Sequence, residues 1–303
     1  MQDSLQQPIL FDTERVQSRA KQHQLQPFKV KQIFFELFKN QHIHWEEMTT
    51  LSKDLKSQLA EEFQILSLEM EQTIEAEDTT KFAFKTHDGH IVEAILMFHW
   101  QDEKYSVSGK KKLNRITLCL SSQVGCPVNC LFCVTGKLGF RRNLTREEMI
   151  SQVLYANWYV KRRFGKKEDG TNWGVRNVVF MGMGEPLLNY DEVLKSVEVM
   201  LAQDRLSLGR RHVTISTSGI IPGIKRLIED KVEVKLAVSL HAPNQSLRNQ
   251  IMPIAKAYPL DKLMQVIDEY VEATNNRIFY EYIMIRGITD TPELARELAE
   301  LLK

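Results

Sequence analysis

Three of the four cysteines fall in the CxxxCxxC run Cys126-Pro-Val-Asn-Cys130-Leu-Phe-Cys133, directly after a predicted strand. Three thiolates this close in one loop can bind three irons of a cube-shaped iron–sulfur cluster and leave the fourth iron open to a small chelating ligand. Thiolates also bind zinc, but zinc knuckles usually pair two CxxC units or one CxxC with HxxxH, and no second CxxC exists here. The run predicts an iron–sulfur site, with a zinc site or inert thiols as the alternatives.

Polar residues end three further predicted strands. Gly184 allows the backbone to approach a ligand, and Glu185 can accept hydrogen bonds from an ammonium group. A tight turn is the alternative there, and a dinucleotide-binding GxGxxG fails because position 187 is leucine. The remaining strand-end candidates, which taken alone are more typical of backbone caps, are Ser216, Ser239, Leu240 and His241.

Two other residues are candidates outside these strand ends. Cys119 lies before the three-cysteine run and, as a lone thiol in a strand, would usually be a small buried apolar side chain. Glu93 interrupts the apolar run 91–98. It is either the solvent-facing residue of an alternating strand or a functional carboxylate.

From Arg115 onward, predicted strands alternate with predicted helices. The strands are 115–121, 177–181, 212–217, 233–240 and 278–285, and the helices are 145–164, 190–202, 222–229, 260–274 and 291–302. This alternation indicates a parallel sheet with right-handed crossovers. The strand-end candidates then lie at the carboxyl ends of the strands, where such folds bind ligands.

The amino-terminal part has a different pattern. Residues 27–74 carry apolar side chains at near-helical spacing and are predicted to be helical. Residues 80–100 alternate and predict a hairpin with Asp88-Gly89 at its tip, and 101–112 are predicted to be a linker or loop. We therefore expect a helical accessory domain plus β-hairpin at 1–100 and an α/β core at 101–303.

Charge and hydropathy limit the function classes. Residues 101–172 contain 14 Lys and Arg against 6 Asp and Glu, although the chain has a net charge of only +1. Such a region fits a phosphate-rich partner, and a solvated helix end with its loop is the alternative. No apolar run reaches the roughly 18 residues that span a bilayer, and no secretory signal or disulfide framework is visible. We expect a cytoplasmic protein with no membrane partner.

The cysteine run and its flanks resemble the signature of radical S-adenosylmethionine (SAM) enzymes. The flanks are Ser121-Ser-Gln-Val-Gly-Cys126 and Cys133-Val-Thr-Gly-Lys-Leu-Gly-Phe-Arg-Arg-Asn-Leu144. Together with Met181–Asn189, Val213–Gly219 and Ser239–Asn244 they resemble the RlmN-type adenine-C2 RNA methyltransferases and their Cfr-type relatives, which methylate C8. The Pro-Leu-Leu-Asn after Glu185 and the second serine of Ser216-Thr-Ser218 follow the C2 pattern.

The resemblance implies a partial (β/α)6 radical SAM barrel, of which about five strands are present. It implies a [4Fe–4S] cluster on Cys126, Cys130 and Cys133. It also implies SAM contacts from the strand-end residues Gly184, Glu185, Ser216, Ser239, Leu240 and His241. Cys119 matches the cysteine that resolves a covalent enzyme–RNA adduct by disulfide exchange, and Glu93 matches a proton acceptor.

By the same resemblance, one SAM methylates a carboxy-terminal cysteine. A second SAM is cleaved to a 5′-deoxyadenosyl radical that activates this methyl for addition to C2 of an adenine in 23S rRNA or tRNA. An electron donor such as flavodoxin is implied. No cysteine follows Cys133, so we expect a fragment of a longer protein that lacks the last barrel strand and does not turn over. A zinc-stabilised RNA-binding module, with Cys119 as fourth ligand, is the alternative from another class.

Overall fold

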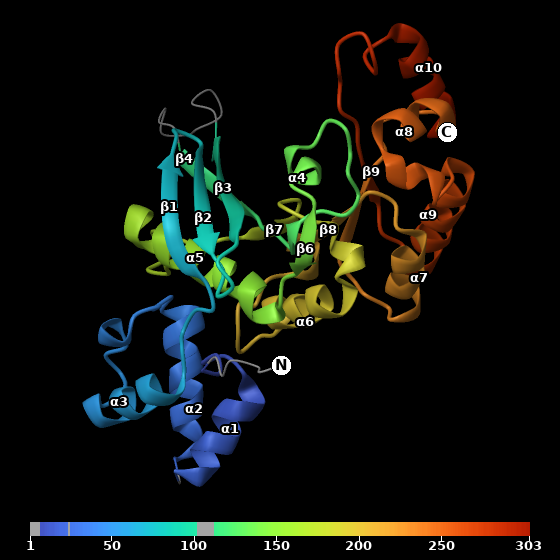
Figure 1. Ribbon diagram of the computed structural model, residues 1–303. Coiled ribbons are helices and arrows are strands. Elements are labelled where there is room, and N and C mark those ends of the chain that lie inside the picture. Colours follow the sequence, from blue (N-terminus) through green and yellow to red (C-terminus); the bar gives the residue numbers. More distant parts are fainter. Residues whose placement is uncertain (1–6, 24, 102–111) are drawn as a thin grey trace. The chain divides into compact units, whose positions relative to one another are not determined.

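The computed structural model describes residues 7–23, 25–101 and 112–303. The chain forms two compact units that interleave along the sequence (Figure 1). Unit 1 comprises Met1–Leu118, Thr145–Asn177 and Lys195–Leu208, and unit 2 comprises Cys119–Leu144, Val178–Leu194 and Gly209–Lys303. The expected domain boundary near residue 100 stays a prediction, and most of the predicted linker at 101–112 lies outside the described residues.

Unit 1 begins with short helices that bury apolar faces against one another. Their bounds are α1 Thr13–Gln22, α2 Pro27–Phe34, the π-helical η1 Phe35–Lys39, the 3₁₀-helical η2 Trp45–Glu47 and α3 Lys53–Glu62. Asp12 and Ser52 cap α1 and α3 by accepting bonds from backbone N–H groups. A fully buried carboxylate, Glu36, accepts bonds from the Asn40 amide and the Thr50 backbone N–H, which ties η1 to the chain before α3.

The first three of the four described strands in unit 1 pair in antiparallel fashion. The strands are β1 Glu69–Glu75, β2 Thr79–Lys85, β3 Ile91–Gln101 and β4 Lys112–Cys119, which lie side by side in that order. Buried Phe82 and Phe84 of β2 pack edge-on against Tyr155 of α5 (Arg146–Phe164). Helix α5 begins with a capping box in which Thr145 and Glu148 satisfy each other's backbone N–H groups.

Unit 2 contains four neighbouring strands, β7 to β10. They are β7 Asn177–Phe180, β8 Val213–Thr217, β9 Lys235–Ser239 and β10 Ile278–Glu281. The pairs β7–β8, β8–β9 and β9–β10 are all parallel. A two-stranded antiparallel ladder of β5 (Gln123–Gly125) and β6 (Phe140–Asn143) completes the strands of this unit.

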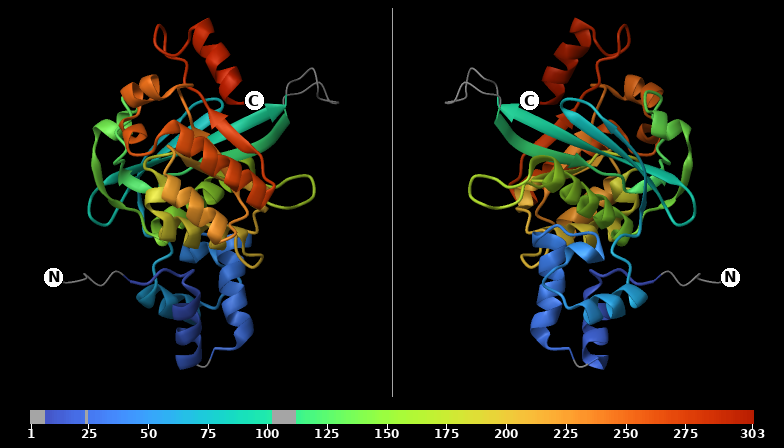
Figure 2. Two further views of the ribbon diagram at one scale, coloured as in Figure 1. Left: turned by 90° about the vertical axis from the view of Figure 1, so that its right-hand side faces the viewer. Right: turned by 90° about the vertical axis from the view of Figure 1, so that its left-hand side faces the viewer.

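Helices lie between the strands of unit 2 and after the last of them. They are α4 Val134–Lys137, η4 Pro186–Leu188, α6 Tyr190–Leu201, η5 Arg210–His212, α7 Ile221–Glu229, α8 Gln245–Ile251, η6 Pro253–Lys256, α9 Leu260–Thr274 and α10 Pro292–Leu301. Figure 2 shows α7 and α9 side by side, and the two helices are in direct contact. The fully buried Tyr270 of α9 donates its hydroxyl to the Val234 carbonyl, just before β9. Because each crossover contains a helix, all four strands point the same way and their carboxyl ends meet at one edge.

Most sequence-predicted elements are confirmed within a few residues. The five predicted strands correspond to β4, β7, β8, β9 and β10, and the hairpin corresponds to β2 and β3 with Gly89 at a positive φ of 82°. The helical prediction for 27–74 is wrong at its end, because Glu69–Glu75 forms strand β1 paired with β2. The mixed α/β class with a parallel sheet is confirmed. Among the described residues no helix is long and apolar enough to cross a membrane.

Candidate functional site

The three-cysteine run forms a loop that the β5–β6 ladder holds at its base. The Cys126 backbone N–H donates to the Gly139 carbonyl, at 3.2 Å. Gly125 has a φ of +75°, and a Cβ there would lie 1.7 Å from the same carbonyl oxygen, so no side chain fits. Between the second and third cysteines, the Leu131 N–H donates to the Ile251 carbonyl at the end of α8. The loop is therefore fixed at both its base and its tip.

The three thiols lie close enough to affect one another electrostatically. Burial, followed by the charges of Glu185 and Cys133, raises the pKa of Cys126 to about 11. Burial, followed by Cys126 and Cys133, raises the pKa of Cys130 to about 12. Without a bound cation, these two side chains are neutral thiols at physiological pH. A cationic metal would reverse this preference, since coordinated thiols are deprotonated.

The arrangement fits a multi-iron cluster better than a single ion. Within residues 7–23, 25–101 and 112–303, no three Cys, His, Asp or Glu side chains converge on a position for one metal ion. A structural zinc site needs four ligands around one centre, about 2.0–2.3 Å from the metal. In a [4Fe–4S] cluster each thiolate binds a different iron, so Cys126, Cys130 and Cys133 need not converge.

The glycine turn after β7 lies directly against the chain that leads into the cysteine loop. A Cβ on Gly184 would lie 2.7 Å from Gln123 Cβ, and one on Gly182 would lie 2.7 Å from the Leu120 carbonyl. Gly184 also has a φ of +110°, which side-chain-bearing residues rarely adopt. The Gln123 side chain accepts the Glu185 N–H at 2.8 Å. Glycine is therefore required here for packing as well as for backbone conformation.

Glu185 is a nearly fully buried carboxylate beside the thiols. Ser218 donates to its Oε2 through the backbone N–H at 2.6 Å and the hydroxyl at 2.7 Å, and the Leu187 N–H donates to Oε1 at 3.1 Å. Burial raises the pKa of Glu185, and this effect outweighs the three hydrogen bonds, which favour the charged form and lower the pKa. A cationic group entering this site would restore a full negative charge to the carboxylate and give it a partner.

A second carboxylate joins the ends of β8, β9 and β10. Glu281 Oε2 accepts from the Ser239 hydroxyl at 3.1 Å and from the Ser216 hydroxyl at 3.4 Å. The Glu281 carbonyl accepts the N–H groups of both Leu240 and His241. Glu281, which is not identified from the sequence, thereby connects all four predicted residues, namely Ser216, Ser239, Leu240 and His241.

His241 is buried, 9% exposed, and held in an unusual conformation. Its φ is +58°, a left-handed value that costs free energy in a non-glycine residue and is common at functional sites. Its Nδ1 accepts the Ile283 N–H at 3.2 Å, and its ring lies 4.9 Å from the Phe132 ring in the cysteine loop. Burial, followed by the Arg248 charge, lowers the His241 pKa to about 4. The imidazole is therefore neutral at physiological pH.

Arg248 of α8 is fully buried and connects these strand ends. Its Nη2 donates to the Ser218 carbonyl at 2.6 Å and its Nε donates to the Leu240 carbonyl at 3.2 Å. Nη1 is buried and has no hydrogen-bond partner within the described part of the chain. Burial lowers the Arg248 pKa to about 10, so the guanidinium remains charged near Cys130. A buried cation with a spare donor suits an anionic ligand or cluster beside it.

Cys119 belongs to unit 2 and is influenced by the charge of Glu281, whereas Glu93 belongs to unit 1. Cys119 ends β4, is a buried free thiol, and does not share the mutual pKa effects of the other three cysteines. All four cysteines are free, so the disulfide implied by adduct resolution is not supported by this structure. Glu93 belongs to unit 1, where its half-exposed carboxylate pairs with Lys81 at 2.9 Å. Their predicted catalytic roles stay predictions.

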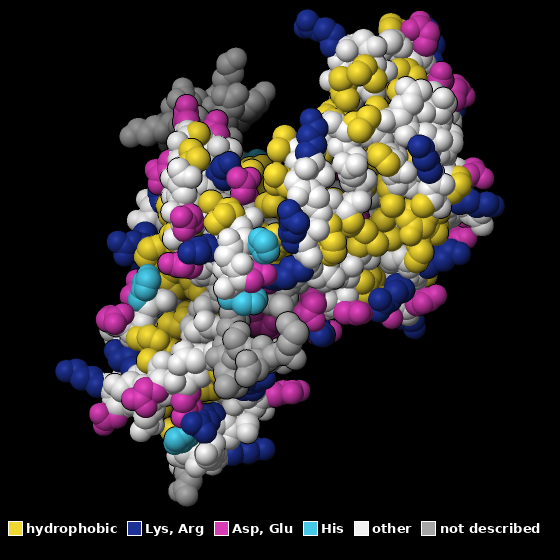
Figure 3. All heavy atoms as spheres, viewed as in Figure 1, with side chains coloured by type: hydrophobic (Ala, Val, Ile, Leu, Met, Phe, Trp, Pro, Cys, Tyr) yellow, Lys and Arg dark blue, Asp and Glu magenta, His cyan; other side chains and the backbone are white. Residues whose placement is uncertain are grey.

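Several cations among the described residues of the basic segment 101–172 have partners within the protein. Lys161 donates to the Asn40 carbonyl, and Arg163 lies over the Phe98 ring at 4.8 Å, both within unit 1. Lys112 pairs with Glu168. On the face of the whole molecule shown in Figure 3, Lys and Arg side chains are interspersed with Asp and Glu. Much of this charge is thus engaged within the fold.

Three site residues were not assigned from the sequence, namely Ser218, Arg248 and Glu281. Ser218 is identified in the sequence only as the second serine of Ser216-Thr-Ser218, without a predicted contact. Arg248 carried no signal, because arginine is seldom fully buried. Glu281 carried none because it is a single carboxylate at the end of a short, mostly apolar strand and belongs to no recognisable motif.

Comparisons with known proteins agree with this geometry. The Radical SAM superfamily model matches residues 120–299. A crystal structure of a radical SAM methyltransferase from Sphaerobacter thermophilus superimposes with a TM-score of 0.85 at 34% identity, covering 98% of this chain and 82% of that one. The fold is that of a radical SAM enzyme.

Comparison with curated relatives identifies the family within the radical SAM superfamily. A probable dual-specificity RNA methyltransferase RlmN from Aquifex aeolicus is 40% identical over 96% of this chain and 78% of its own length. A probable dual-specificity RNA methyltransferase RlmN 2 from Protochlamydia amoebophila is 38% identical over 97% of this chain and 76% of its own length. The chain belongs to the RlmN family of radical SAM RNA methyltransferases.

Replacing Gly184 tests the close packing beside the cysteine loop. Gly184→Ala adds a Cβ 2.7 Å from Gln123 and strains the backbone at φ +110°. We expect the affinity for S-adenosylhomocysteine, measured by calorimetry, to fall at least tenfold. Gly287→Ala is the matched control, because its φ is +72° but no atom lies within 4 Å of the added Cβ. Equal affinities for the two variants would contradict the close-approach argument.

Alkylation of the metal-free protein tests the environment of Cys119. Burial, followed by the charge of Glu281, raises the pKa of this thiol from 9.0 to about 12. Since only the thiolate reacts, three pKa units leave about 1,000-fold less reactive form at pH 8. We expect iodoacetamide to label Cys119 far more slowly than a cysteine peptide, with a rate that rises as pH rises toward 12. Mass spectrometry of tryptic peptides measures both rates, and equal labelling would show that the thiol is not buried.

Proposed function

We propose that this protein uses SAM to methylate C2 of an adenine in 23S rRNA and in tRNA, with a [4Fe–4S] cluster on Cys126, Cys130 and Cys133. The observation that carries the proposal is the grouping in unit 2 of three thiols on one loop that influence one another electrostatically, the buried Glu185 carboxylate and the connected ends of β8, β9 and β10. The names of the curated relatives support RNA as the substrate.

In this proposal, different residues around the cysteine loop bind different parts of the SAM molecule. Glu185 accepts hydrogen bonds from the SAM ammonium, and Gly184 lets the ligand approach the backbone. The hydroxyls of Ser216 and Ser239 face the ribose and carboxylate side, together with Leu240 and His241. When bound, the cluster supplies one electron that breaks a carbon–sulfur bond of SAM. The neutral imidazole of His241 adds no positive charge to this site at pH 7.

Ser218 and Asn189, which follow the pattern of the C2-methylating enzymes, both belong to this site. This supports methylation at C2 of adenine rather than at C8. Ser218 donates twice to Glu185. The Asn189 amide donates to the carbonyls of Ser122 and Leu144, at 2.8 Å each, and so fixes the chain on either side of the cysteine loop. Both residues therefore shape the SAM site.

The remaining roles complete the proposal. Cys119 resolves the covalent enzyme–RNA adduct, and Glu93 accepts a proton. A flavodoxin-like donor supplies electrons, and the protein acts in the cytoplasm. The target adenine is presented unstacked, from an RNA loop. A methyl-carrying cysteine is required in addition to the four in these 303 residues, so SAM cleavage is the first readout for this chain.

Metal content and SAM cleavage test the proposal. After anaerobic reconstitution, Cys126→Ala, Cys130→Ala and Cys133→Ala should each lose most of the bound iron and sulfide, because each removes one cluster ligand. Cys119→Ala is the matched control and should retain wild-type iron. With a strong reductant and SAM, the wild-type chain should form 5′-deoxyadenosine and methionine, measured by liquid chromatography. The three ligand variants should form neither.

A zinc module would give the opposite pattern. Tight zinc binding, with metal loss in Cys119→Ala equal to that of the other three variants, would place four thiolates on one ion and overturn the cluster assignment. Iron binding without SAM cleavage would retain the metal site and overturn the enzymatic proposal. Formation of 8-methyladenosine in target RNA, by the protein that carries the methyl cysteine, would replace C2 with C8.

A further inference from the structure

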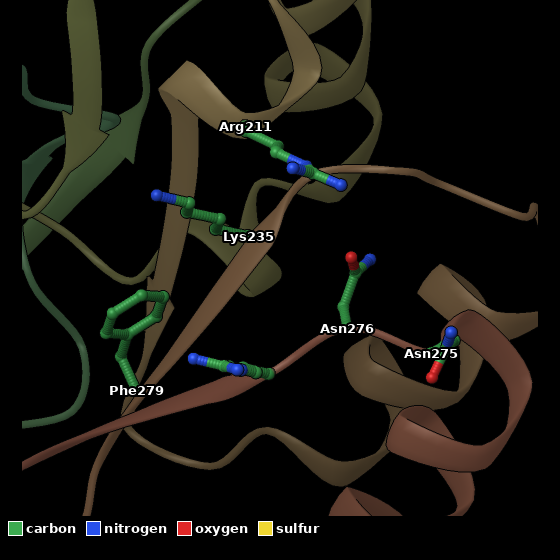
Figure 4. Close-up of a pocket in the computed structure, with 6 residues that line it drawn as sticks. Arg211, Lys235, Asn275, Asn276 and Phe279 are labelled. Carbon is green, nitrogen blue, oxygen red and sulfur yellow. The ribbon is translucent and has the colours of Figure 1, made fainter.

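A second pocket lies in unit 2 at the opposite ends of the same strands. It has a volume of about 510 Å³ and is lined by Arg211, Lys235, Asn275, Asn276, Arg277 and Phe279 (Figure 4). Arg211 precedes β8, Lys235 begins β9, and Asn275 to Arg277 form the turn between α9 and β10. Lys235 and Ser239 are the first and last residues of β9, which places the pocket roughly 13 Å along the strand from the SAM site.

The cations of this pocket have no acidic partners. Among the described residues, no carboxylate lies within ion-pair distance of Arg211, Lys235 or Arg277. The adjacent Arg210, by contrast, is paired with Glu233. Three unpaired cations around one hollow create a local positive potential that attracts an anion. Arginine forks match the oxygen geometry of phosphate particularly well.

The pocket also offers an aromatic surface and neutral polar groups. Phe279 is 48% exposed, and Lys235 Nζ lies 5.3 Å from its ring centroid. Figure 4 shows the Arg211 guanidinium and the Asn276 amide on one side of the pocket and Phe279 on the other. An exposed phenyl ring next to cations is the combination that stacks a base while the cations bind its phosphate.

Asn275 shapes the turn that supplies half of this lining. It ends α9 in the left-handed conformation, with φ +53°, which asparagine tolerates better than most residues. Its N–H donates to the Val271 carbonyl at 2.8 Å. The turn sets the direction of Arg277 and of the first residues of β10.

We propose that this pocket binds a nucleotide, with the phosphate between Arg211, Lys235 and Arg277 and the base stacked on Phe279. The nucleotide is either a unit of a single-stranded RNA segment or a free nucleotide. The inference does not rest on the proposed methyl transfer, because the pocket uses none of the residues assigned to the cluster or to SAM.

Binding to reconstituted protein tests this proposal with two probes. Adenosine 5′-monophosphate is titrated by calorimetry, and a fluorescein-labelled unstructured oligoribonucleotide is titrated by anisotropy at several salt concentrations. The double variant Arg211→Gln/Arg277→Gln should weaken binding of the recognised probe at least tenfold. For the oligonucleotide it should also reduce the salt dependence of binding. Phe279→Leu should weaken nucleotide binding while leaving inorganic phosphate binding unchanged.

Matched controls locate the site. Arg210→Gln, at a neighbouring arginine that is ion-paired, should leave both titrations unchanged. Saturating S-adenosylhomocysteine should not displace the nucleotide, and formation of 5′-deoxyadenosine should be normal in all pocket variants. Tight binding of the oligonucleotide alone identifies an RNA contact, and tight binding of the monophosphate alone identifies a free-nucleotide site. Binding of neither probe, displacement by S-adenosylhomocysteine, or equal loss in Arg210→Gln would overturn the inference.

Discussion

The buried guanidinium of Arg248 is the interaction on which the site depends. It donates to carbonyls at the ends of β8 and β9, and its helix α8 ends at the residue that accepts the Leu131 N–H of the cysteine loop. One side chain thus links the strand ends that carry Ser218 and Leu240 to the loop that carries the thiols. Losing it would remove the guanidinium donor from the Ser218 carbonyl, at a cost of roughly 1–3 kcal/mol, whereas the Leu240 carbonyl would keep its bond from the Ala242 N–H. A buried cation is tolerated because carbonyls surround it and thiols that become anionic on metal binding lie nearby.

Two carboxylates, the buried Glu185 and the partly buried Glu281, also connect the strand ends. Glu185 holds Ser218 after β8, and Glu281 holds Ser216 and Ser239. Each serine hydroxyl donates a hydrogen bond to a carboxylate of the protein. A ligand therefore enters a site whose side chains are already oriented. Preorganisation of this kind lowers the cost of positioning a flexible molecule such as SAM. The opposite ends of the strands have unpaired cations instead, so one set of parallel strands presents two chemically different ends.

Much of this site could be predicted from the sequence, because the cysteine spacing and the strand ends are local features. The five strands and the Asp88-Gly89 hairpin were predicted correctly for the same reason. The helical prediction extends wrongly over strand β1, because the alternation of Leu66-Ser-Leu-Glu-Met-Glu is only six residues long and follows directly on a helical pattern. Its pairing with β2 makes this segment a strand. Arg248 and Glu281 act through partners distant in sequence, and no local pattern reveals such a partner.

The central claim is that the open iron of a cluster on Cys126, Cys130 and Cys133 binds SAM next to Glu185. Electron–nuclear double resonance of the reduced, reconstituted protein with SAM labelled by ¹⁵N at its amino group tests this most directly. The account predicts a nitrogen coupling that shows direct coordination to the cluster, and its loss or marked weakening in Glu185→Gln. A cluster signal that is unchanged by labelled SAM, or an unaltered coupling in Glu185→Gln, would contradict it.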